Sequence, residues 1–126
     1  MSRKSLYNLG LYVVIFSTLL SCQQEDERHG IAWKNIEKGL QTAFISAKNG
    51  DTIRLDAGHF WFTRSLMMDG KSDIVIIGAG MDETILSFKG QQEGAEGIKI
   101  ANCKNIQLIG FTVEDAKGDN IKVTDT

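Results

Sequence analysis

The 126-residue chain carries 14 basic and 16 acidic residues, a formal net charge of −2, without any long run of basic residues. This mildly acidic balance argues against nucleic acid as a partner and against charge-driven binding to an anionic membrane surface. Proline is absent, although average usage of about 5% would predict roughly six. The absence suits a backbone whose N–H groups are mostly committed to strand ladders.

The N-terminal 22 residues have the features of a secretion signal. Arg3 and Lys4 precede an apolar run over residues 9–20, which is shorter than the roughly 20 residues needed to span a bilayer. The run closes with Leu19-Leu20-Ser21-Cys22, which resembles the lipobox of bacterial lipoproteins. In that family the Cys becomes diacylated, so the resemblance implies cleavage before Cys22 and a lipid bilayer as its partner. The alternative is an uncleaved anchor helix with an incidental Cys.

We therefore expect residues 1–21 to be a signal peptide and residues 22–31 to be a flexible tether. The tether sequence QQEDERHG, which includes His29, is polar and lacks apolar periodicity. The expected location is the cell envelope, with a lipid anchor in the outer membrane, and the acidic residues after Cys22 resemble surface-export signals. Cys103 would remain as the one free thiol, which excludes an intramolecular disulfide and a Cys-based metal site.

A helix is predicted over residues 32–48. Ile36, Leu40, Phe44 and other apolar residues recur at helical spacing, while Lys and Glu residues occupy most of the other positions. Asn49-Gly50 supplies a left-handed stop after the last apolar residue. This amphipathic helix is the first element of the folded domain that we expect at residues 32–126.

Short strands are predicted from Thr52 onward, separated by Gly, Asn and Asp. Two stretches repeat: residues 98–102 match residues 121–125 at a spacing of 23, and residues 71–78 match residues 103–110 at a spacing of 32. The two spacings differ by nine residues, and we predict that these nine form a loop in the polar stretch 89–97. Repeats of this length made only of short strands are typical of stacked coils.

Side-chain alternation also predicts where the chain bends. Successive side chains of a strand point to opposite faces, so Ile106 and Leu108 share one face. Phe111 and Val113 would lie on the other face of a straight strand. The chain must therefore bend at Ile109-Gly110 for both pairs to face one interior. Asn102 and Asn105 bracket a second corner, because Asn tolerates the left-handed conformation.

A competing motif lies in residues 73–80, DIVIIGAG, which resembles the strand and turn of a dinucleotide-binding fold. That motif requires a Gly three residues after Gly80 and then a helix. The chain has Glu83 at this position, followed by the strand-like Thr84–Phe88. We therefore disfavour nucleotide binding.

The stretch from Gly50 to Val123 resembles the N-terminal coils of the pectin-lyase-like superfamily, and the helix before it resembles the N-terminal cap of that family. The resemblance implies an all-β fold: a right-handed parallel β-helix, or solenoid, with an N-terminal amphipathic capping helix and an incomplete C-terminus. In polysaccharide lyases and epimerases of this family, carboxylates bind calcium or neutralise uronates. The weak calcium candidates that the resemblance implies are Glu114, Asp115, Asp119 and Asp125; no cofactor is otherwise expected.

A ligand-binding site is predicted around the aromatic strand Phe60-Trp61-Phe62. If both Phe residues face the core, Trp61 faces outward between His59 and Arg64, where an indole can stack on a sugar ring. Burial of Trp61 under a loop or under the helix is the alternative. Surface roles for His59 and Arg64 are the corresponding alternative to ligand binding.

The function expected from these features is that of a membrane-anchored envelope module. It would be the N-terminal part of a carbohydrate-binding or uronate-polysaccharide-processing protein, without activity and without catalytic residues of its own. Two full repeats and the start of another precede Thr126, so we expect either a piece of a longer protein or end-to-end pairing with another chain. The alternatives are a structural or adhesive lipoprotein with no saccharide ligand and, second, a polysaccharide lyase or epimerase.

Overall fold

The first helix of the described residues packs on the core through one row of apolar side chains. The computed structural model describes residues 36–125, so the predicted signal, the tether, Cys22 and His29 lie outside the described residues. Helix α2 (Ile36–Ser46) buries Ile36, Leu40 and Phe44, which are spaced four residues apart. It ends two residues before the predicted boundary because the Lys48 N–H is donated to Asp51 Oδ2 at 2.9 Å.

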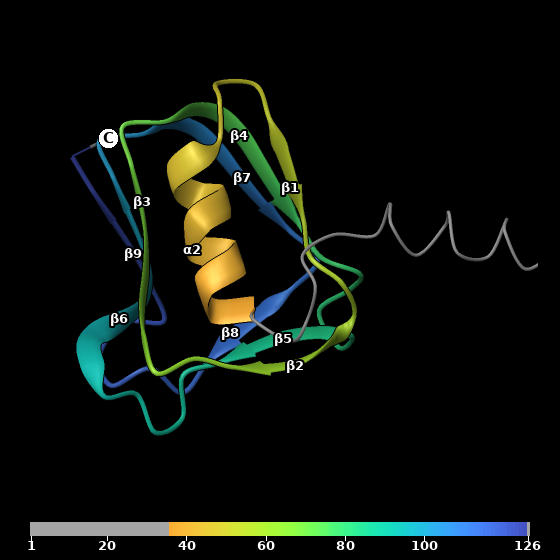
Figure 1. Ribbon diagram of the computed structural model, residues 1–126, viewed down its shortest axis with the longest axis vertical. Coiled ribbons are helices and arrows are strands. Elements are labelled where there is room, and N and C mark those ends of the chain that lie inside the picture. Colours follow the sequence, from red (N-terminus) through yellow and green to blue (C-terminus); the bar gives the residue numbers. More distant parts are fainter. Residues whose placement is uncertain (1–35, 126) are drawn as a thin grey trace, which may run out of the picture.

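Nine strands follow α2 in the described part of the chain, and every third strand pairs in parallel (Figure 1). The three sheets have the orders β1-β4-β7, β2-β5-β8 and β3-β6-β9. The strands are β1 (Thr52–Arg54), β2 (Gly58–Trp61), β3 (Arg64–Asp69), β4 (Ser72–Ile77), β5 (Thr84–Ser87), β6 (Glu93–Ala101), β7 (Lys104–Ile109), β8 (Thr112–Glu114) and β9 (Ile121–Thr124).

The register of the sheets confirms that the two sequence repeats lie side by side. Ile98 pairs with Ile121, at the spacing of 23, and Ile74 pairs with Ile106, at the spacing of 32. The prediction that the nine extra residues lie at 89–97 is only partly right. Three of them lie in the β4–β5 turn, because Arg54 pairs with Ile77 but the next pair is Gly58 with Thr84. The others precede β6 or bulge from it, between the pairs Arg64–Glu93 and Leu66–Ile98.

Apolar side chains from all three sheets and from α2 meet in one core. The rings of Phe62 and Phe88 stack there with centroids 5.0 Å apart. The predicted bend is confirmed: Ile106, Leu108, Phe111 and Val113 all pack against the core, and Gly110 between the two pairs has a φ of 67°.

The predicted Asn corner is also confirmed. Asn102 and Asn105 have φ values of 54° and 53°. Each side chain donates a hydrogen bond to an aspartate on a neighbouring strand. Asn102 Nδ2 donates to Asp69 Oδ1 on β3 at 2.9 Å, and Asn105 Nδ2 donates to Asp73 Oδ1 on β4 at 2.8 Å. The two Asn residues therefore connect the corner between β6 and β7 to the neighbouring strands β3 and β4.

The predicted fold class is wrong. The described residues form three short parallel sheets of three strands each together with one helix, and they make neither a closed array nor a solenoid. Solenoids repeat one unit at a near-constant period. Here the distance along the chain between paired residues differs from pair to pair, from 23 for Thr52–Val75 to 32 for Ile74–Ile106. The sequence repeats report which strands pair, but they do not establish a continuing regular repeat.

Candidate functional site

The outer face of β2 carries the most exposed aromatic side chain of the described residues. Phe60 and Phe62 are buried, whereas the Trp61 between them is 57% exposed. Because both Phe side chains face the core, alternation along the extended chain places Trp61 on the outer face, and the alternative of a buried Trp61 is not observed. The indole packs neither under a loop nor under α2.

The Trp61 ring is held by its neighbours on the same face. The His59 imidazole stacks on it, with ring centroids 4.4 Å apart and an interplanar angle of 17°. His59 Nε2 lies 3.5 Å from Glu114 Oε1. Glu114 reaches this position because the pairs Trp61–Ser87 and Ser87–Glu114 place it two strands away across the sheet. A carboxylate, an imidazole and an indole thus form one ordered row on the surface.

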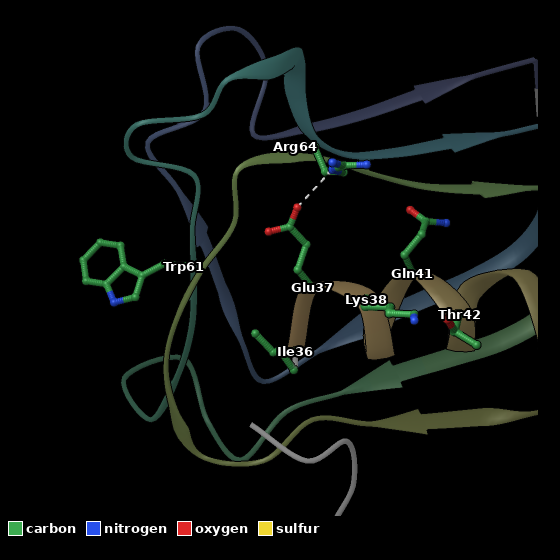
Figure 2. A pocket seen from close by; sticks show the side chains of 7 residues that line it. All are labelled: Ile36, Glu37, Lys38, Gln41, Thr42, Trp61 and Arg64. Carbon is green, nitrogen blue, oxygen red and sulfur yellow. Dashed lines mark ion pairs between the residues drawn. The ribbon is translucent and has the colours of Figure 1, made fainter. Parts of the chain in front are cut away.

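A groove of about 560 Å³ lies between α2 and the start of β3 (Figure 2). Five of the seven residues that line it are of polar type; the seven are Ile36, Glu37, Lys38, Gln41, Thr42, Trp61 and Arg64. Figure 2 shows the Trp61 indole directed away from Glu37 and the helix, so Trp61 forms the outer rim of the groove and not its floor.

Glu37 is the most connected side chain of the groove. Its carboxylate accepts hydrogen bonds from the Thr63 N–H at 3.1 Å and from the Thr63 hydroxyl at 2.9 Å. The same group lies 3.3 Å from Arg64 Nε. These contacts tie the first turn of α2 to the chain between β2 and β3.

The structure places Arg64 beside the groove, with its charge already partnered by two carboxylates. The guanidinium lies 3.3 Å from Glu37 and 3.9 Å from Glu93 Oε2. Sequence reasoning missed Glu37, Lys38 and Gln41, because these residues fall on the polar side of the helix. The acidic residue in the first helical turn was the one visible signal, and it does not indicate which strand the helix meets.

The four weak calcium candidates do not form a metal site. Among residues 36–125, no group of three or more His, Cys, Asp or Glu side chains is placed to hold a metal ion. Glu114 pairs with His59 instead. Asp115 and Asp125 occupy left-handed positions, with φ values of 61° and 53°. Asp119 is exposed, and its carbonyl accepts the Gly97 N–H at 2.9 Å.

Comparison with protein-family models, with curated proteins and with solved structures finds no match to this chain. The comparisons therefore identify neither the predicted superfamily nor the predicted signal. In the part of the chain that the structure describes, no helix is long and apolar enough to cross a membrane.

Proposed function

We propose that this chain is a carbohydrate-binding module of the cell envelope, anchored through a lipid on Cys22, in which Trp61 stacks on a sugar ring. The observation that carries the proposal is the exposed Trp61 indole, stacked on His59, at the rim of the groove.

The ring stack supports sugar binding because it presents a rigid apolar surface next to hydrogen-bonding groups. A pyranose has one apolar C–H face, which suits an indole face, and a rim of hydroxyl groups. His59 covers one face of the indole. Only the other face is therefore open to a sugar.

The groove supplies polar partners of the kind that sugar hydroxyls need. Lys38, Gln41 and Thr42 come from one side of α2, and Glu37 and Arg64 lie beside them (Figure 2). A cavity of about 560 Å³ lies in the range of known small-molecule sites. Glu37 and Glu114 are already engaged by Thr63, Arg64 and His59, so the proposal is one of binding and not of turnover.

Replacing Trp61 by Ala tests this function. We expect purified Trp61→Ala protein to bind its best glycan about tenfold more weakly than wild type, since an aromatic stacking contact contributes about 0.5–1.5 kcal/mol beyond area effects. A glycan array would select the ligand and isothermal titration would measure the affinity. Met81→Ala is the matched control, because Met81 is also a large exposed apolar residue but lies on the β4–β5 turn.

Two outcomes would contradict the proposal. If wild type binds no glycan, the structural or adhesive alternative is preferred. If the purified chain converts pectate or alginate to unsaturated uronates, the lyase alternative is preferred.

A further inference from the structure

We infer that Glu37 makes the Trp61 groove select uncharged saccharides and reject uronates, an inference that rests on the proposed function. The groove contains an exposed arginine, which would ordinarily suggest an acidic ligand. The contacts of that arginine point to the opposite specificity.

Glu37 forms an ion pair with the guanidinium on its Nε side. Arginine recognises a carboxylate best by two parallel N–H donors, and Nε–H belongs to one of the two edges that can supply such a pair. Glu37 Oε1 lies 3.3 Å from Nε. The glutamate is itself fixed, because Oε2 accepts the Thr63 N–H at 3.1 Å and its side chain is only 26% exposed. A uronate would therefore have to displace an ordered carboxylate to use this edge.

The charge around the groove also disfavours an acidic ligand. Three carboxylates lie at or beside the site: Glu37 and Glu93 next to Arg64, and Glu114 next to His59. The basic groups of the groove are Arg64 and Lys38. A uronate bound in the groove would add a further negative charge beside these carboxylates, and like charges near a protein surface repel one another.

An uncharged sugar gains from the same carboxylates. Ionised carboxylates only accept hydrogen bonds, and each carries two oxygens with several lone-pair sites. Sugar hydroxyls can donate to the acceptor sites that the protein leaves unused on Glu114. Lys38 can donate to a hydroxyl oxygen in return. The site is therefore complementary to a neutral chain rich in hydroxyl groups.

The test compares xylohexaose and cellohexaose with hexagalacturonate, by isothermal titration at low salt. We expect the wild-type protein to bind the better neutral oligosaccharide about tenfold more tightly than hexagalacturonate. Glu37→Gln keeps an oxygen for the Thr63 N–H but removes the charge. It should raise the affinity for hexagalacturonate about tenfold and change that for the neutral ligand by less than about twofold, the effect expected for removing one nearby like charge.

Asp125→Asn is the matched control, because Asp125 is exposed beyond β9 and Asn tolerates its left-handed conformation. It should leave both affinities unchanged. Wild-type protein in 0.5 M NaCl provides a measurement that does not depend on any variant: the preference for the neutral ligand should shrink, because salt screens the repulsion.

The outcomes separate the two proposals. If wild type binds hexagalacturonate as tightly as the neutral ligands, with both dependent on Trp61, this inference is overturned and the proposed function stands. An unchanged preference in Glu37→Gln protein that melts like wild type overturns it as well, as does a preference insensitive to salt. If no saccharide binds, the proposed function fails and the inference fails with it.

Discussion

Glu96 shows how one polar side chain stabilises the irregular part of β6. The residue belongs to the bulged stretch that separates the pairs Arg64–Glu93 and Leu66–Ile98. Its carbonyl accepts hydrogen bonds from the Ser65 hydroxyl and from Gln91 Nε2. Its carboxylate lies 3.4 Å from Lys122 Nζ on the neighbouring β9. Backbone and side chain of Glu96 thus hold the bulge to both adjacent strands.

Glu96 should make the stability of the fold depend on pH. A hydrogen bond from its own backbone N–H lowers the pKa of the carboxyl from its ordinary value of 4.5, and Lys122 lowers this pKa further, while burial opposes both effects. Because the folded-state pKa is the lower one, the stabilisation is fully present well above pH 4.5 and is lost as pH falls through the folded-state pKa. We expect Glu96→Gln to lower Tm at pH 7 and to lower it by less at pH 3.

Thermal unfolding followed by circular dichroism at the two pH values measures this difference. Glu83→Gln is the control, since Glu83 is exposed on the β4–β5 turn. An equal effect of Glu96→Gln at pH 7 and pH 3 would show that the charge of Glu96 does not contribute.

Helix α2 closes one edge of the third sheet with its side chains. Gln41 Oε1 accepts the Met67 N–H and Gln41 Nε2 donates to the Met67 carbonyl, both at 2.9 Å. The amide therefore takes the place that a neighbouring strand would have along β3. Lys71 Nζ donates to the Ile45 and Ala47 carbonyls at 2.8 and 2.7 Å, which satisfies the C-terminal end of the helix. Edge strands covered in this way are protected from pairing with other chains.

Gln41→Ala should loosen this edge. The substitution removes two exposed hydrogen bonds, each of which contributes about 0.5–1.5 kcal/mol net, because water can take the place of the lost amide. We expect a lower urea midpoint and faster hydrogen exchange of the Met67 amide. Gln107→Ala, on the exposed side of β7, is the control for the change of residue type. If the Met67 amide exchanges at the wild-type rate in Gln41→Ala, the helix does not protect this edge.

The two ends of the molecule differ in how they are covered. At one end α2 lies across the space between the three sheets (Figure 1). At the other end β7, β8 and β9 are the outermost strands of the described sheets, and Ile121 and Val123 are exposed there. End-to-end pairing with another chain at this face stays a prediction.

The predicted lipid anchor would determine where the whole molecule works. Cys22 precedes Ile36 by fourteen residues, so a lipid on Cys22 would keep α2 within about 50 Å of the bilayer, the reach of an extended chain of that length. The groove beside α2 would then meet glycans close to the membrane surface.

Cys22→Ala should abolish lipidation and cleavage of the signal. We expect metabolic labelling with an alkyne fatty acid to mark the wild-type protein and the Cys103→Ala control, but not the Cys22→Ala variant. The variant should also keep the mobility of the uncleaved chain in gel electrophoresis. The absence of label from wild type, or equal label in Cys22→Ala, would contradict the lipoprotein interpretation.

Part of the candidate site was predictable from alternation along one strand. The pattern Phe60-Trp61-Phe62 places two rings in the core and one outside, since successive side chains of an extended chain point to opposite faces. His59 shares the outer face with Trp61 for the same reason. Glu114 could not be placed beside them, because its position depends on the register of two successive strand pairs.

The repeats at spacings of 23 and 32 predicted the pairs Ile98–Ile121 and Ile74–Ile106, because stacked strands bury matching apolar positions. Alternation and repeats are patterns within short stretches, so they can be recognised in the sequence alone. The fold class and the pairing of Glu37 with Arg64 depend on where α2 and the connections pack in space. Glu37 and Thr63 are 26 residues apart. No local periodicity specifies a contact at that separation, because it arises only when the helix packs against β3.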